Sequence, residues 1–473
     1  MTTNAFISSF STKYISIITQ FLGSLVTARL IAPDSFGAFS VCVIILTTAN
    51  IIRDLGISNF LIVHDSNCRK TLDSAFTLVF LTSLALFLSI MFGAGSVARF
   101  FESAAIEPAL QIMSLSLLIT PIYVIKSSIF KKEMDFTKDL VSSTLGIILS
   151  TSLTIYLAAQ GYEVIALAIG NLALFIVQTA VILFYDKRLY SFSLLHAHSI
   201  FQKSKYVLTY NVISHLGLSC VEFISAKSAG LTDTGLLSRA NTTASMFVKL
   251  FNEGFHPVVV PYFSKAKVSE SKTEKFLLMA KISSNLSIPF YITLGILAEP
   301  AIVILFGEKW IAAAPFLTII CIGRAISAIT SVYEPALMGL GLANRLVKVG
   351  LYIQVFRIAI ALLTFNYGIY VMVICATVFP PILRTTLFVA LANRELNINV
   401  AQQLSIAAKA FLVAVLASSP LIALIVSQDS GWWTNVLVLI GALVTSLCLY
   451  IALVLNYEEP KALVRSFFKN NGS

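Results

Sequence analysis

Apolar runs of about 18 to 25 residues recur along the whole chain, and a run of this length crosses a bilayer as a helix. Only 12% of the residues are charged, whereas soluble domains have roughly 25%. The mean hydropathy is +0.87, and the segments between the runs are too short to form a large soluble domain. The sequence therefore predicts an all-α polytopic membrane protein.

Fourteen spans are predicted, in two bundles of six followed by two C-terminal helices. The spans are expected near residues 6–28, 37–63, 75–98, 106–129, 140–158, 162–184, 206–226, 240–262, 280–306, 311–337, 346–365, 367–390, 405–427 and 433–456. Residues 1–185 are expected to form the first lobe, 206–395 the second, and 396–473 the last two spans with a tail. Residues 186–205 would join the lobes on the cytoplasmic side, where their basic and aromatic side chains suit the headgroup region.

The net charge of +10 indicates membrane topology rather than nucleic-acid binding. With both termini placed in the cytoplasm, most of the 33 Lys and Arg residues fall on the cytoplasmic side. This asymmetry follows the positive-inside rule and sets the orientation. Five cations are assigned to the outer side: Arg29, Arg99, Lys227, Arg239 and Lys309.

Two stretches of the chain resemble each other at equivalent places in the two lobes. ARLIAPDSFGAFS (28–40) and AKSAGLTDTGLLS (226–238) each place a cation at an outer helix end and a glycine eight residues later. Later landmarks also match between the halves. The matched pairs are Arg29 with Lys227, Gly37 with Gly235, Pro108 with Pro315, and Gly161 with Gly368. Six spans separate the matched points, which predicts a parallel repeat about an axis along the membrane normal.

Charged residues inside the spans are the candidate functional groups, because an arginine at mid-bilayer costs at least a few kcal/mol and must face protein or water. Arg324 and Arg357 lie near the middle of their spans, and neither has an acid at i±3 or i±4. Arg53 and Asp54 are adjacent, so they cannot face each other on one helix. Gly56 follows this pair and is expected to loosen the helix.

Two interpretations of these interior charges stay open. They form internal ion pairs, with Glu222 and Glu253 as candidate partners, or they line a hydrated cavity that binds an anion. Lys249 and Glu253 can pair with each other at i, i+4. Arginine suits phosphate because its planar fork binds two oxygens and stays charged. The cavity interpretation assigns diphosphate binding to Arg53, Lys249, Arg324 and Arg357, and polar or proton-coupling roles to Glu222, Glu253, His215, Asn252 and Gln354.

The sequence contains no pattern that indicates an enzyme. GLGLANR (339–345) lacks the lysine and hydroxyl residue of a phosphate-binding loop, and no HExxH motif occurs. The six cysteines suggest neither a disulfide framework nor a metal site. We therefore expect no cofactor, no metal and no catalytic residue.

Several motifs resemble the polysaccharide transporter family, the Wzx-type flippases of the multidrug/oligosaccharidyl-lipid/polysaccharide exporter superfamily. ARLIAPDSFGAFSVCVIIL followed by RDLG resembles the family's first hairpin. GLLSRANTTASMFVKLFNEGFHPVVVPYFSK (235–265) and LFGEKWIAAAPFL (305–317) resemble two later family motifs. The resemblance covers essentially the whole chain and is nearest to the fourteen-span branch of colanic-acid exporters. The hairpin motifs assign gating to Arg29, Gly37, Asp54, Gly56, Lys227, Gly235 and Arg239.

The resemblance implies transport of an undecaprenyl-diphosphate-linked oligosaccharide across a bacterial inner membrane by alternating access, for capsule, exopolysaccharide or O-antigen synthesis. It implies membrane lipids, a polysaccharide polymerase and a co-polymerase as partners, and a monomer is expected. Three alternatives stay open. A lipid II flippase and an antiporter for organic cations share the architecture, and a membrane polymerase or ligase represents the enzyme class.

Overall fold

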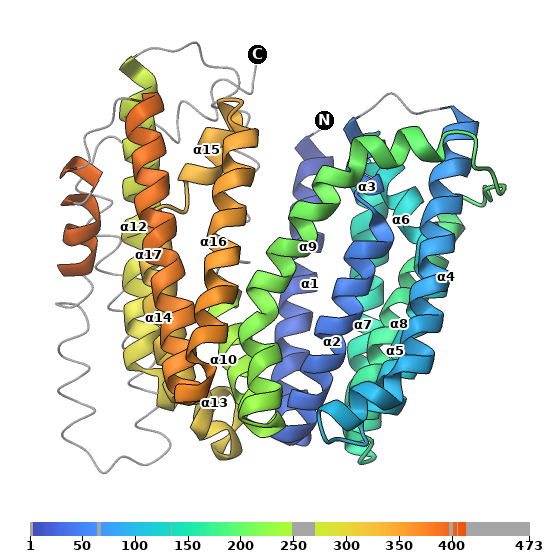
Figure 1. The fold of residues 1–473 in the computed structure, drawn as a ribbon, viewed down its shortest axis with the longest axis horizontal. Coiled ribbons are helices and arrows are strands. Elements are labelled where there is room, and N and C mark those ends of the chain that lie inside the picture. Colours follow the sequence, from blue (N-terminus) through green and yellow to red (C-terminus); the bar gives the residue numbers. More distant parts are fainter. Residues whose placement is uncertain are drawn as a thin grey trace. The chain divides into compact units, whose positions relative to one another are not determined.

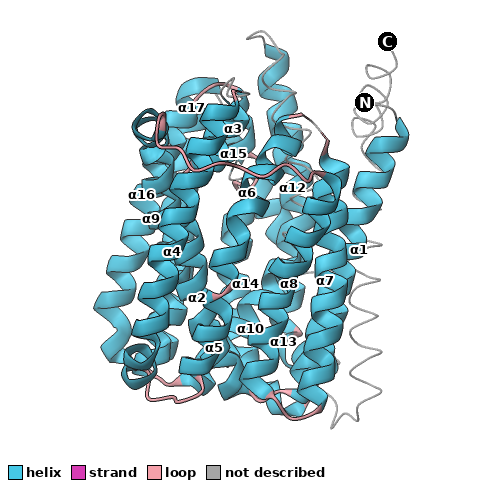
Figure 2. Ribbon diagram, turned by 90° about the vertical axis from the view of Figure 1, so that its right-hand side faces the viewer, coloured by secondary structure: helices cyan, strands magenta, loops and turns pink. Residues whose placement is uncertain are grey.

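The computed structural model describes residues 3–63, 68–133, 135–247, 270–396, 401–403 and 405–412. These residues are helical and contain no strand (Figure 2), which confirms the predicted all-α class. Ten of the described helical stretches are long and apolar enough to cross a membrane. The multi-pass character is therefore confirmed. The count of fourteen stays a prediction, because span 14 and most of spans 8 and 13 lie outside the described residues.

The helices follow the predicted spans closely and are joined by short connections (Figure 1). The first group is α1 (Thr3–Leu30), α2 (Pro33–Asp54), α3 (Ile57–Val63), α4 (Arg69–Phe100), α5 (Ile106–Ser114), α6 (Ser116–Lys132), α7 (Phe136–Ala159) and α8 (Glu163–Tyr185). The second group is α9 (Ala197–Ser228), α10 (Leu231–Phe247), α12 (Glu270–Ile296), α13 (Ala298–Phe306), η2 (Glu308–Ala313), α14 (Ala314–Ala328), α15 (Tyr333–Gly339), α16 (Ala343–Thr364), η3 (Phe365–Tyr367) and α17 (Ile369–Leu396).

The described chain forms two compact units. The first comprises the described residues up to Thr242 together with Gly350–Ala376, and the second those of Thr243–Val349 together with the described residues from Thr377 on. Helix α9 and most of α10 belong to the first unit, where α9 packs against α2. The two units are defined by contacts, whereas the lobes were predicted from the internal repeat. The predicted boundary between the lobes at residues 186–205 therefore stays a prediction.

Each unit has its own apolar core. In the first, small and apolar residues of α2, α4 and α5 pack together, for example Val41 of α2, Ala94 of α4 and Met113 of α5. In the second, Phe276 of α12 packs edge-on against Tyr333 of α15, with ring centroids 4.8 Å apart, and Phe388 of α17 joins them. A Cβ atom on Gly323 of α14 would overlap the carbonyl oxygen of Thr377, so α14 and α17 approach closely there.

The two hairpins that the sequence assigned to the outer side have shorter connections than predicted. Only residues 31–32 separate α1 from α2, and only 229–230 separate α9 from α10. Proline at the first position of α2 fits because it needs no hydrogen bond for its missing N–H there. Arg239, which the sequence placed in an outer connection, lies within α10 and is buried. The prediction of a long loop at 227–239 was wrong because Asp233 and Thr234 continue a helix that composition alone does not mark.

The Asp-Leu-Gly motif breaks the helix between α2 and α3. Leu55 and Gly56 both adopt positive φ, 50° and 75°, and Asp54 accepts hydrogen bonds from the backbone and hydroxyl of Ser58. The carboxylate therefore caps α3, as side chains at helix N-termini do. A Cβ atom on Gly56 would lie 2.8 Å from the carbonyl oxygen of Ser204 in α9, so the break also brings α9 close.

Gly56→Ala should lower the apparent melting temperature of the protein in detergent, because alanine disfavours this φ and its methyl group meets α9. The expected loss is about 1–3 kcal/mol of stability. Gly93→Ala is the matched control: Gly93 is helical and its Cβ would meet no atom within 4 Å, so alanine should be neutral or slightly stabilising. Equal melting temperatures for both variants would contradict this assignment.

Candidate functional site

Helices α2 and α10 cross at the two glycines that the repeat paired. A Cβ atom on Gly37 would overlap the carbonyl oxygen of Leu231, and one on Gly235 would overlap that of Pro33. The offset between Pro33 and Leu231 is the same as that between Gly37 and Gly235. The contact is therefore reciprocal, as a local two-fold relation between equivalent segments requires.

The same crossing carries a polar contact between equivalent residues. The hydroxyl of Ser40 donates to that of Ser238 at 2.9 Å, again between positions with the repeat's offset. The guanidinium of Arg239 lies 4.2 Å from the ring centroid of Phe36, in the range of a cation–π contact. This crossing, formed by residues 33–40 and 231–239, is called the outer crossing below, because the predicted orientation assigns it to the outer side of the membrane.

Cations flank the outer crossing at the helix ends. Arg29 is exposed in the last turn of α1. Lys227 of α9 donates to Glu102 at 2.8 Å and lies over the ring of Phe100 at 5.1 Å. The hydrogen bond and positive charge of Lys227 lower the pKa of Glu102. This pair ties the outer end of α9 to the connection between α4 and α5.

Arg53 is a deeply buried cation held by a hydroxyl group. Its side chain, in the last turn of α2, is 6% exposed, and Nη1 donates to Thr120 Oγ1 of α6. Its Nε atom is buried and has no hydrogen-bond partner among the described residues. A guanidinium has five N–H donors, and each buried donor without an acceptor costs about 1–3 kcal/mol. An anion with several oxygens would satisfy the open donor.

Two residues near Arg53 were missed by the sequence analysis. Asn50 lies three residues before Arg53, so both side chains share a helix face, and its Oδ1 atom is buried without a hydrogen-bond partner among the described residues. Thr120 fixes one end of the guanidinium. Asn50 could have been identified from the sequence, because an asparagine is unusual in an apolar span. No sequence signal identifies Thr120, since Ser and Thr are frequent in these helices.

Arg357 and Gln354 of α16 face α9. Helix α9 approaches α16 at Gly217, where a Cβ atom would lie 2.6 Å from Cβ of Gln354, and at Gly350, next to the ring of Tyr210. Arg357 lies near enough to Cys220 of α9 to interact electrostatically. The structure therefore brings Gln354 and Arg357 together on one α9-facing side of α16.

Arg324 belongs to the second unit. It lies on α14, is partly buried, and donates from Nη2 to Ser245 Oγ of α10 at 3.0 Å. No pattern in the sequence pointed to Ser245 as a contact of Arg324. In the described contacts, Arg53 and Arg324 thus share one feature: a serine or threonine hydroxyl accepts from the guanidinium.

The polar residues of α9 have separate partners. Nε2 of His215 lies 3.4 Å from the carbonyl oxygen of Ile44 in α2, and Glu222 accepts a hydrogen bond from Asn241 of α10 at 3.1 Å. The sequence had offered Glu222 as a candidate partner for an arginine, and the described contact is instead with an amide. Three further candidates, Lys249, Asn252 and Glu253, lie outside the described residues, so their roles stay predictions.

The buried polar groups of the described helices offer hydrogen-bonding capacity to a ligand. Among the residues that the structure describes, no group of three His, Cys, Asp or Glu side chains could hold a metal ion. The buried polar atoms without a hydrogen-bond partner among the described residues include Nε of Arg53 and Oδ1 of Asn50, which lie three residues apart on α2. Such groups bind an anion that also carries a donor, such as a phosphorylated, hydroxyl-rich molecule.

The chain matches a family model described as a polysaccharide biosynthesis protein over residues 26–315. It is 26% identical over 333 residues to the succinoglycan biosynthesis transport protein ExoT of Rhizobium meliloti, covering 68% of this chain and 66% of the relative. It is 24% identical to the teichuronic acid biosynthesis protein TuaB of Bacillus subtilis, covering 63% and 62%. The matched region thus spans just under two thirds of the length of these relatives.

The lipopolysaccharide biosynthesis protein WzxC of Escherichia coli is 20% identical, covering 70% of this chain and 68% of that protein. Among solved structures, the lipid II flippase MurJ in an inward closed conformation has a TM-score of 0.71 at 14% identity, covering 96% of this chain and 99% of the other. An inward-facing multidrug resistance MATE family transporter has a TM-score of 0.59 at 14% identity, covering 79% and 95%. These likenesses show that this chain has the fold of the multidrug/oligosaccharidyl-lipid/polysaccharide exporter superfamily.

Proposed function

The chain belongs to the family of polysaccharide biosynthesis proteins, and on this basis we propose that it moves a diphosphate-linked oligosaccharide lipid across a bacterial inner membrane. The cargo would be carried on undecaprenyl diphosphate, and both termini of the chain would face the cytoplasm. The relatives ExoT and TuaB are named for the biosynthesis of succinoglycan and teichuronic acid. Their names support an extracellular polysaccharide as the product of the pathway.

The observation that carries this proposal is the buried guanidinium of Arg53. Its Nε donor has no partner among the described residues, and the adjacent Asn50 offers an unused acceptor. A buried charge that the protein itself satisfies only in part is expensive unless a ligand completes it. A diphosphate supplies the oxygens for Arg53, and a sugar hydroxyl is a donor for Asn50. Arg324, Arg357 and Lys249 are further candidates for the same cargo.

Transport would proceed by alternating access, with the outer crossing as the outer gate. The crossing is held by backbone contacts at glycine, one hydroxyl–hydroxyl bond and the cation–π contact of Arg239 with Phe36, so opening it breaks few strong bonds. The two repeats would rock about their common axis. No ATP-binding motif occurs in the sequence, so the energy would come from an ion gradient or from the cargo's own gradient.

Arg53→Ala, Arg324→Ala and Arg357→Ala should each reduce export of surface polysaccharide in a strain that depends on this protein. Loss of one charge-assisted hydrogen bond, worth about 1.5–3 kcal/mol, corresponds to roughly a tenfold to hundredfold loss of binding. Surface polysaccharide per cell measures the effect, with the amount of protein in the membrane determined in parallel. Arg53→Lys keeps the positive charge but lacks the planar guanidinium that binds two oxygens at once. Its export should therefore lie between that of Arg53→Ala and that of the wild type.

Arg99→Ala is the matched control, because Arg99 is exposed and hydrogen-bonds Ser96 of its own helix. Its export should equal that of the wild type. Normal export in all three interior variants, at normal protein levels, would exclude the assigned role of these arginines.

Ser40→Cys combined with Ser238→Cys should lock the outer gate. Their hydroxyl oxygens are 2.9 Å apart, so a disulfide between cysteines at these positions needs little movement. Oxidation should stop export and reduction should restore it, with cross-linking followed by mass spectrometry. Each single cysteine variant controls for the native cysteines. Complete cross-linking with undiminished export would show that the outer crossing does not open during transport.

Glu222 is the candidate for proton coupling, because it is a carboxyl group within the α9–α10 contact. Glu222→Gln removes the titrating group but keeps an oxygen that accepts from Asn241. In proteoliposomes, a pH gradient should accelerate transport by the wild type and leave this variant unaffected. A wild-type rate that does not change when the gradient is collapsed would eliminate proton coupling.

A further inference from the structure

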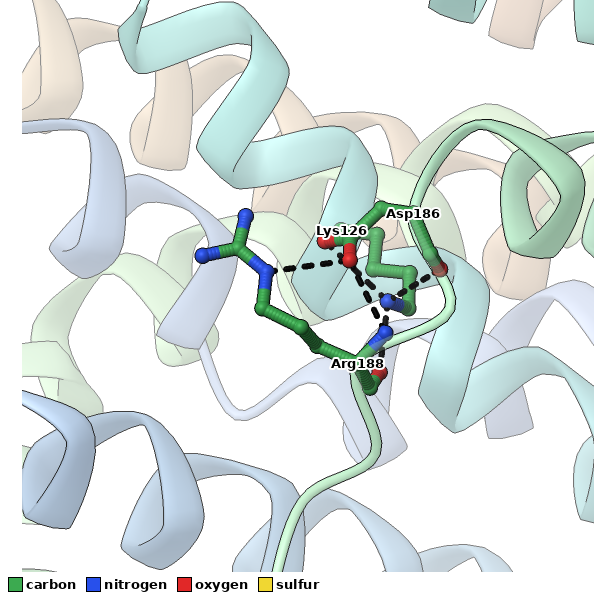
Figure 3. Close-up of polar contacts among 3 residues, drawn as sticks. All are labelled: Lys126, Asp186 and Arg188. Carbon is green, nitrogen blue, oxygen red and sulfur yellow. Dashed lines mark hydrogen bonds and ion pairs between the residues drawn. The ribbon is translucent and has the colours of Figure 1, made fainter.

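The segment between α8 and α9, residues 186–196, is not helical and crosses the end of the first unit (Figure 2). We call it the connecting segment. Its first part is fixed by Lys126 of α6, whose side chain is fully buried. The ammonium donates to the carbonyl oxygens of Asp186 and Arg188, both at 2.7 Å, and lies 3.2 Å from the Asp186 carboxylate (Figure 3).

The middle of the connecting segment is bound by side chains of α4. Asp73 accepts from the backbone N–H of Ser191 at 2.9 Å, and Thr77 accepts from that of Ser193 at 2.9 Å. Ser74 accepts from the backbone N–H of His196 at 3.2 Å. The three α4 side chains are buried. Polar residues on one face of a membrane helix thus supply partners for the segment's backbone.

Asp186 closes the first turn of the connecting segment. Its carboxylate accepts from the backbone N–H of Arg188 at 2.9 Å and from Nε of the same residue at 3.0 Å (Figure 3). Partial burial would raise the pKa of Asp186, but the bonds from Arg188 and Lys126 outweigh it and lower that pKa to about 2. The carboxylate therefore stays ionised, and the contact with Lys126 holds, in the acidic layer next to an anionic membrane.

The opposite face of the segment is apolar and exposed. Phe192 is 66% exposed although its ring contacts Phe80 and Phe76, with centroids 5.5 and 5.9 Å apart, and Leu195 is 69% exposed. Other exposed apolar residues here are Phe184, Leu189 and Leu194. Lys187 and Arg188 are exposed beside them. Exposed apolar side chains next to a pair of cations are typical of a surface that lies in the headgroup layer.

From this arrangement we propose that the connecting segment binds the anionic phospholipid surface of the leaflet at its end of the molecule, which the positive-inside rule predicts to be cytoplasmic. A backbone in a water-poor layer must have its polar groups satisfied by protein. Lys126, Asp73, Ser74 and Thr77 provide these partners, which a segment in bulk water would not need. The leucines and Phe192 would then enter the acyl boundary, while Lys187 and Arg188 contact lipid phosphates.

The test uses the whole protein with an environment-sensitive fluorophore on Leu195→Cys, in a Cys68→Ser background because Cys68 is exposed. The protein is placed in nanodiscs of phosphatidylcholine with increasing phosphatidylglycerol. The label should become protected from aqueous acrylamide and quenched by nitroxide-bearing lipids as phosphatidylglycerol increases. Lys187→Gln should lower the equilibrium constant for protection of the label, at a fixed phosphatidylglycerol content, by about fivefold, the effect of one cation near a membrane surface.

Lys348→Gln is the charge-matched control, because Lys348 is exposed in the second unit. It should leave the titration unchanged, and the melting temperature of each variant reports folding. A label equally open to acrylamide in every lipid mixture would overturn the proposal. The proposal would also be overturned if protection of the label from acrylamide changed neither with the phosphatidylglycerol content nor in the Lys187→Gln variant. Protection that appears only when a membrane protein of the same pathway is added would overturn it too, and would assign the surface to a protein partner.

Discussion

Within a bilayer, a polar group without a partner costs several kcal/mol, and no water is present to supply one. The buried polar side chains of this protein follow that constraint. Lys126 is fully buried, yet two carbonyl oxygens and a carboxylate surround its ammonium. Many serine and threonine hydroxyls, such as those of Thr77 and Thr120, donate to carbonyl oxygens four residues earlier. Against this background, Nε of Arg53 and Oδ1 of Asn50 are among the buried polar atoms of the described residues that lack a hydrogen-bond partner.

The constraint also explains which features the sequence could predict. Helix positions follow from apolar runs, because burial in lipid requires them, and the all-α class was confirmed. Gly37 and Gly235 were found as matched landmarks, and their mutual contact gives the reason for glycine at both places. The partners of buried cations were not predictable, because Thr120 and Ser245 are common residues that distant helices bring to an arginine. Arg239 was misplaced because its helix begins with polar residues.

The partners of the connecting segment could not be predicted from the sequence either. No pattern in the sequence marked Asp73 or Lys126 as residues that contact the connecting segment. Their contacts are with backbone atoms of a segment about sixty to one hundred and twenty residues later in the chain. A backbone N–H has no sequence signature, so no pattern could have paired it with Asp73. The structure therefore adds mainly the long-range side-chain-to-backbone contacts.

These contacts determine where the proposed transport motion has to occur. Helix α9 is fixed within the first unit along its length: by the connecting segment before it, by Ser204 against Gly56, by His215 near Ile44, and by Lys227 on Glu102. The chain instead passes between the units inside α10, α16 and α17, at residues 242–243, 349–350 and 376–377. Gly350 lies at one of these points, and Pro380 and Pro381 lie one turn beyond another. Glycine and proline are the residues at which helices bend most readily, since they weaken or remove a helical hydrogen bond. The proposed alternating access would therefore combine opening of the outer crossing with bending within α16 and α17, while the segment that joins α8 to α9 keeps its contacts.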